Sequence, residues 1–241
     1  MKNFKTKLVT TLSIVGFFTM SLFFNSCSDE SVAQVEENSI QEELGKFQKE
    51  LKIFDENQEN SVVVLIGSDD QSVLNMWTAK NFNLKLIDKN QSLEDVYATD
   101  QDESRANNYN EDDSDEVAAE ISYTILSKQI NAGNKRIILE EVPPYNEDMR
   151  GWSYSTHYSV ADTSSDHTVT VNVFGRNAWK RGYYGVQYKR YSYSGWSTIV
   201  SEWKRIKNNE TASHTETPCY RMKARRKYKG TNNSVIIEIE E

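Results

Sequence analysis

Apolar side chains recur at spacings of three and four residues after a polar, acidic stretch over 28–38. This period places them on one stripe of an amphipathic helix over about 39–55, and Ser39 with Glu42 forms a capping box at its start. We expect the helix to dock on its own domain, with a short coiled coil to a partner as the alternative. The stripe consists of Ile40, Leu44, Phe47, Leu51 and Phe54.

The next part of the chain mixes strand and helix patterns. Runs rich in β-branched and alternating apolar residues predict strands over 62–66, 73–78, 82–87 and 136–142. Ser114 is positioned to cap a helix whose buried face carries Val117, Ile121 and Ile125 and which ends at Gly133. The combination predicts a small α/β portion over 61–145.

After Pro143 and Pro144 the apolar period changes to two and stays there. Half-buried antiparallel strands are predicted over 168–173, 184–189, 219–228 and 234–240. The segment 196–206 fits both a helix and a strand, and its Trp, Thr, Ile and Val residues favour a strand.

Matching the apolar faces of the last two segments predicts a hairpin with Tyr228 opposite Val235. We therefore expect an antiparallel β-sandwich-like domain over 146–241. The whole chain is predicted to be an α+β protein, with an N-terminal amphipathic helix, a small α/β portion and this C-terminal domain.

The first 26 residues have the pattern of a secretory signal. Lys2, Lys5 and Lys7 form a positive start, and the next seventeen residues, 8–24, carry no charge. The uncharged stretch is interrupted by Thr and Ser and falls short of the roughly 20 apolar residues of a spanning helix. An uncleaved anchor helix remains an alternative.

The residues around Cys27 resemble the lipobox of Bacteroidota outer-membrane lipoproteins. The resemblance rests on Phe24-Asn25-Ser26-Cys27 and on the acidic Ser28-Asp29-Glu30 that follows. It implies cleavage before Cys27, acylation of that cysteine, and display on the outer membrane facing the cell exterior, anchored in the lipid bilayer. Residues 27–60 would then form a lipidated tether and the amphipathic helix; a plain Cys27 thiol is the alternative.

Charge divides the mature chain into two unlike halves. Residues 28–150 carry 28 acidic and 11 basic side chains, a net of −17, whereas residues 151–241 carry 8 and 14, a net of +6. The asymmetry indicates either two functional regions or an acidic segment lying against a basic one.

The basic half is also rich in aromatic residues, which stack on sugar rings while Arg and Lys neutralise anions. For an exported protein this composition favours non-enzymatic binding of an anionic polysaccharide or an outer-membrane protein partner, without a cofactor and without nucleic acid. The alternative is that these aromatic residues only pack and line sheets. The predicted ligand-binding residues are Trp179, Arg181, Tyr183, Lys189, Tyr191 and Tyr193.

Catalytic and metal patterns are sparse. The chain has three histidines, His157, His167 and His214, and only His214 lies near a second candidate, Cys219, which more often is an inert buried thiol. Glu140 and Glu141 are adjacent in a predicted strand, so they point to opposite faces and cannot flank one sugar bond.

A loop with carboxylates at calcium-loop spacing has Arg105 where that loop requires glycine, and we expect no metal. Its candidate ligands are Asp100, Asp102, Ser104 and Glu111. A secreted-type hydrolase acting on polysaccharide or peptide remains the alternative function, with a structural accessory subunit as a third. If Cys27 is acylated, Cys219 has no partner for a disulfide.

Overall fold

The computed structural model describes residues 43–98, 117–144, 152–160, 166–176, 182–229 and 234–241. The chain divides into two units, 1–38 and 39–241, and all described residues belong to the second. Strands dominate this unit, and its two described α-helices, α2 (Gln71–Met76) and α3 (Leu93–Ala98), have six residues each. A 3-10 turn, η1, spans Ala79–Asn81.

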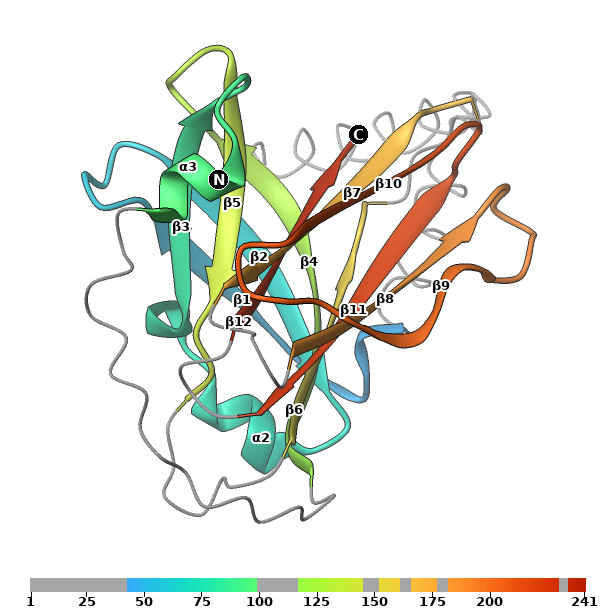
Figure 1. Cartoon of the computed structure of the whole chain (residues 1–241). Helices are drawn as coiled ribbons and strands as arrows, with labels where there is room; N and C mark the ends of the chain where they lie inside the picture. Colours follow the sequence, from blue (N-terminus) through green and yellow to red (C-terminus); the bar gives the residue numbers. More distant parts are fainter. Residues whose placement is uncertain (1–42, 99–116, 145–151, 161–165, 177–181, 230–233) are drawn as a thin grey trace, which may run out of the picture. The chain divides into compact units, whose positions relative to one another are not determined.

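One layer of the fold is a seven-stranded sheet, called the large sheet below (Figure 1). Its neighbours pair antiparallel except β4 and β6, which run parallel. The sheet joins strands from both sides of residue 145. Its strands, in spatial order, are β1 (Phe47–Phe54), β2 (Ser61–Ser68), β4 (Val117–Gln129), β6 (Trp152–Tyr158), β11 (Arg221–Lys229), β8 (Gly182–Lys189) and β9 (Ser197–Arg205).

Two smaller sheets form the facing layer. Strand β12 of one sheet lies beside strand β5 of the other, so the two sheets together form one layer. The first has the order β10 (Thr211–Glu216), β7 (Val169–Arg176) and β12 (Ser234–Glu240), and the second pairs β3 (Phe82–Asp88) with β5 (Lys135–Glu141).

The interior between the layers is filled by two apolar clusters. One joins β7 and β12 to β8 and β11, with Val173, Val186 and Ala224 fully buried. The other joins β2 and β4 to β3, β5 and helix α2, around Trp77 and Tyr123. A third cluster lies on the outer side of the facing layer, where α3 covers strands β3, β5, β7 and β12. The architecture is therefore a β-sandwich with one short helix on its outer face.

The predicted N-terminal amphipathic helix is wrong: apart from residues 43 and 44, its described part is not helical. Residues 47–54 form the edge strand β1, in which Phe47, Leu51 and Ile53 face the core. Lys49 takes the inward position between them, and its Nζ donates hydrogen bonds to the carbonyls of Leu74 and Trp77. Because the inward position 49 is polar, the sequence shows apolar residues at 47 and 51 with none between them on that face. A spacing of four fits both a helix and a strand, so the period of two is not recognised.

Two further predictions in the α/β portion are also wrong. The predicted helix after Ser114 is the strand β4, in which Ile121, Tyr123 and Ile125 alternate toward the core and a bulge interrupts the pairing with β2. The predicted strand 73–78 is mostly the helix α2, which Asp70 caps by accepting a hydrogen bond from the backbone of Ser72 at 2.7 Å. The α+β class is thereby corrected to a β-rich sandwich.

The remaining predicted strands are confirmed, including the ambiguous segment 196–206, which contains β9. The predicted hairpin between the last two is wrong. Strand β12 pairs with β7 in the facing layer, with Val235 opposite Gly175, whereas β11 lies between β6 and β8 in the large sheet. Strand β12 could bury its apolar face in either layer. Matching its apolar face to that of β11 therefore does not identify β7 as its true neighbour.

A buried ion pair crosses the space between the layers. Arg226, 2% exposed, pairs with Glu141 of β5 and donates a hydrogen bond to the Tyr123 hydroxyl at 2.8 Å. The Tyr228 hydroxyl donates to the other carboxylate oxygen of Glu141 at 2.7 Å. Removal of one partner from such a pair leaves a charge in a medium that solvates it poorly.

Candidate functional site

The outer face of the large sheet carries a row of cations along β11. Outward positions of this strand are occupied by Lys223, Arg225 and Lys227, while Met222 and Ala224 face the core. Alternate residues of a strand lie about 7 Å apart, so the three charges form a regular ladder. The sequence already shows this alternation as Arg221-Met222-Lys223-Ala224-Arg225.

Aromatic rings from the neighbouring strand β6 lie under these cations. Trp152 and Tyr154 point outward and are half-buried, whereas the alternate positions, which include Ser155 and His157, are buried. Tyr158 is on the same outward side but is only 7% exposed, because Arg221 and Lys223 lie over its ring. Lys227 Nζ lies 4.4 Å from the centre of the Trp152 ring and 5.5 Å from that of Tyr154. Strand β6 therefore turns its large rings away from the core, the reverse of the usual arrangement.

Rings from the other side of β11 complete the arrangement. The Arg225 guanidinium lies 4.8 Å from the Trp203 ring, and Lys223 Nζ lies 4.2 Å from the Trp196 ring. Trp203 adopts a φ of 59° within a bulge of β9, which is a strained backbone for a bulky residue. We call this set the cationic–aromatic face; it consists of Trp152, Tyr154, Tyr158, Tyr183, Trp196, Trp203, Lys223, Arg225 and Lys227.

Among the described residues, the three cations of this face contact aromatic rings rather than carboxylates. Within the described ranges, Lys223, Arg225 and Lys227 contact rings but form no ion pair with a carboxylate. Packing against the rings removes part of the hydration of the Lys223 ammonium, and this burial lowers its pKa, while Glu43 opposes the shift. Cation–π contacts of this kind contribute about 0.5–2 kcal/mol each. The face thus holds fixed, partly dehydrated positive charges.

One end of the face is closed by an acidic residue. Glu43 forms ion pairs with Lys189 at 3.1 Å and with Arg221 at 2.9 Å. Arg221 is 1% exposed and also donates to the carbonyl of Ser159, so it serves packing rather than ligand contact. Burial lowers the pKa of this guanidinium, and Glu43 opposes the shift.

The structure brings together only part of the predicted ligand set. Tyr183 lies on the cationic–aromatic face, edge-on to Trp152 at 5.8 Å, and Lys189 lies over Trp196 at 5.0 Å but is paired with Glu43. Tyr191 and Tyr193 stack at 5.4 Å in the turn after β8, and Tyr193 is 85% exposed. Trp179 and Arg181 lie outside the described residues, as do Cys27 and the candidate calcium ligands.

The catalytic candidates are engaged in packing. Cys219 is fully buried, which raises the pKa of its thiol to about 11, and its sulfur lies 3.8 Å from the carbonyl of Lys189. The His214 ring hydrogen-bonds the Tyr184 hydroxyl at 3.2 Å. Glu140 pairs with Arg176 and Glu141 with Arg226, on opposite faces of β5, as expected from their adjacency.

Comparison of the chain with protein-family models, with curated protein sequences and with solved structures gave no match. Among the described residues, no cluster of His, Cys, Asp and Glu is suited to hold a metal ion. No helix in the same ranges is long and apolar enough to cross a membrane.

Proposed function

We propose that this protein is a non-enzymatic binding protein of the cell surface, lipid-anchored through Cys27, and that its cationic–aromatic face binds an acidic polysaccharide. One observation carries the proposal: the ladder of Lys223, Arg225 and Lys227 has aromatic neighbours but no carboxylate partner among the described residues. Three charges about 7 Å apart on a rigid strand match a polymer with regularly repeated anionic groups better than a single small anion.

The way the rings are used indicates what kind of contact dominates. The rings on this face hold cations in place, so charge attraction would supply most of the affinity and sugar stacking less. The Tyr193 ring, in the turn after β8, is the most exposed large aromatic side chain among the described residues and is free to stack on a sugar. A protein partner from the envelope would need an acidic surface to fit the same ladder.

The experiment compares the full chain with a triple variant, Lys223→Gln, Arg225→Gln and Lys227→Gln. Each exposed charge contact contributes about 0.5 kcal/mol, so the loss of three should weaken binding to a uronic-acid or sulfated polysaccharide about tenfold. Binding of the unaltered chain should also weaken as salt rises, because exposed charges are screened beyond about 8 Å at physiological ionic strength.

A matched control removes three exposed lysines elsewhere, Lys52→Gln, Lys80→Gln and Lys207→Gln, and so changes net charge by the same amount. Equal weakening by both triple variants would show that only net charge matters and would overturn the assignment to this face. Tighter binding to single-stranded DNA than to any acidic polysaccharide would reassign the ligand class.

A further inference from the structure

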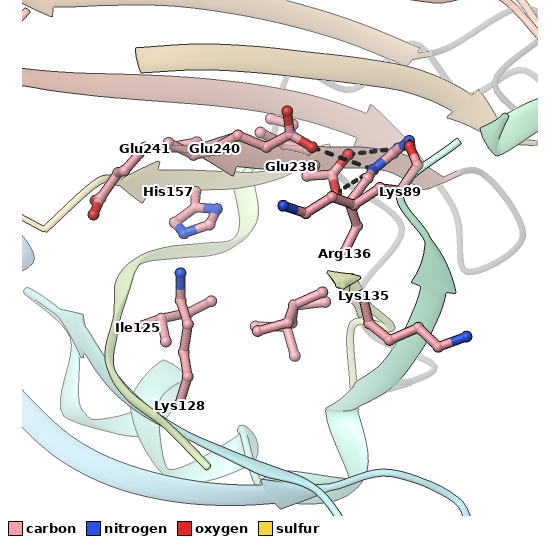
Figure 2. Close-up of a pocket in the computed structure, with 13 residues that line it drawn as sticks. Lys89, Ile125, Lys128, Lys135, Arg136, His157, Glu238, Glu240 and Glu241 are labelled. Atoms are coloured by element: carbon pink, nitrogen blue, oxygen red, sulfur yellow. Dashed lines mark hydrogen bonds and ion pairs between the residues drawn. The ribbon is translucent and has the colours of Figure 1, made fainter. Parts of the chain in front are cut away.

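A cavity of about 360 Å³ opens between the two layers, where the two interior apolar clusters meet (Figure 2). Its residues come from β4 and β6 of the large sheet and from β5 and β12 of the facing layer. The volume falls within the ~300–1,000 Å³ of small-molecule sites. The cavity lies between the sheets, whereas the cationic–aromatic face is on the outside of one of them.

Part of the cavity wall is apolar. Five aliphatic side chains line it, of which Ile237 and Leu139 are almost completely buried. Covering an apolar surface of this kind with an apolar ligand instead of water lowers the free energy. The five are Ile125, Ile137, Leu139, Ile237 and Ile239.

Two nitrogen-bearing side chains converge at one end. His157 is 6% exposed, stacks on Tyr123 with ring centres 4.7 Å apart, and has a buried Nδ1 without a hydrogen-bond partner. Figure 2 shows the Lys128 ammonium directed toward the His157 ring. Lys128 forms no ion pair within the described ranges. Buried polar atoms are rarely left unpartnered, so this nitrogen needs an explanation.

Apart from Lys89, the other charged groups at the cavity already have partners. Arg136 pairs with Glu238 at 2.9 Å and with Glu240 at 3.2 Å (Figure 2). Lys135 pairs with Asp88. Glu241 accepts a hydrogen bond from the backbone of Val160 at 3.1 Å. Lys89 and Lys128 are both exposed and form no ion pair within the described ranges. Of the two, Lys128 is the one directed toward the buried imidazole (Figure 2).

We propose that this cavity binds a small amphipathic carboxylate, with its apolar body against the five aliphatic side chains and its carboxylate between Lys128 and His157. Burial and the nearby Lys128 lower the pKa of His157 to about 3, so the imidazole is neutral at pH 7 and carries one N–H that can donate. The ammonium then supplies the positive charge next to the ring, and the carboxylate accepts a charge-assisted hydrogen bond from it. The small volume of the cavity and the one unpaired cation beside the imidazole suit a small monoanion and not a polymer.

The probe is octanoate, compared with 1-octanol, which has the same chain length and no charge. The full chain is reconstituted in lipid nanodiscs, with empty nanodiscs as the blank, and binding is followed through the imidazole signals in NMR spectra. Because the chain has three histidines, the signals of one ring can be separated from the other two. Octanoate should shift the His157 signals and should bind at least tenfold more tightly than 1-octanol.

Two variants separate charge recognition from burial. Lys128→Met should weaken octanoate about tenfold and leave 1-octanol unchanged, whereas Lys80→Met, at an exposed site elsewhere, should alter neither. Ile239→Trp, which fills the cavity, should abolish binding of both probes. Equal affinities for octanoate and 1-octanol, insensitivity to Lys128→Met, or shifts confined to other histidines would each overturn the proposal. The triple variant of the cationic–aromatic face should bind octanoate normally, so the two sites can fail independently.

Discussion

Acid should destabilise this fold through His157 in particular. The imidazole has a pKa of about 6.5 in an unfolded chain and about 3 here, because the ring is buried and Lys128 lies nearby. Between these values the unfolded state binds one more proton than the folded state, so the free energy of unfolding increases with pH. The stabilisation that results from the lowered pKa of His157 is fully present above pH 6.5 and is lost progressively as pH falls toward 3.

The size of the effect follows from the shift. A difference of about 3.5 pKa units corresponds to about 5 kcal/mol over the whole window, and about 2 kcal/mol is already lost at pH 5. Replacement of His157 by leucine removes the titrating group and keeps an apolar contact with Tyr123. Urea unfolding at pH 7 and pH 5 should therefore show that the unaltered chain loses about 2 kcal/mol more than His157→Leu does.

NMR titration offers a direct check on the same reasoning. The His157 ring signals should not change between pH 8 and pH 4, since the folded protein keeps this imidazole neutral over that range. A ring that titrates near pH 6.5, or an identical pH dependence of stability in the two proteins, would refute the argument that burial controls the protonation of His157.

Three other results are expected. Arg226→Met should lower the free energy of unfolding by about 3–5 kcal/mol in urea titrations, and adding Glu141→Leu should recover part of the loss, because the double variant leaves no unpaired buried charge. Cys219 should resist iodoacetamide at pH 8 until the protein unfolds, as followed by mass spectrometry, since burial raises the pKa of its thiol to about 11. Intact mass of membrane-extracted protein should show loss of residues 1–26 and added acyl mass, and Cys27→Ala should release the protein from the membrane.

Strands with a clean period of two could be predicted from the sequence. In β7 and β8, every second residue is apolar and no inward position carries a charge. The prediction failed where an inward position is polar and finds a specific partner, as Lys49 does at the carbonyls that end α2. It also failed where Ile121 and Ile125, four residues apart, fit a helix and a strand equally well.

The candidate site was only partly predictable for a related reason. The cation row of β11 is visible in the sequence, but its aromatic neighbours Trp152 and Tyr154 lie far from it along the chain and are brought close only by the pairing of β6 with β11. A rule that puts large rings inside assigns the wrong face to β6, because it ignores the cations that cover those rings. The cavity around His157 depends on the spacing of the layers, which no local pattern encodes.

The two edges of the large sheet are protected against pairing with other chains. Unpaired edge strands attract further strands and promote aggregation, and an inward charge or a bulge opposes this. On β1 the inward charge is Lys49. A second strand that paired with β1 would have to place its apolar face beside this ammonium. On β9 it is the bulge that contains Trp203, which breaks the register an incoming strand would need. Both edges can therefore stay unpaired even when many copies of the protein are crowded together.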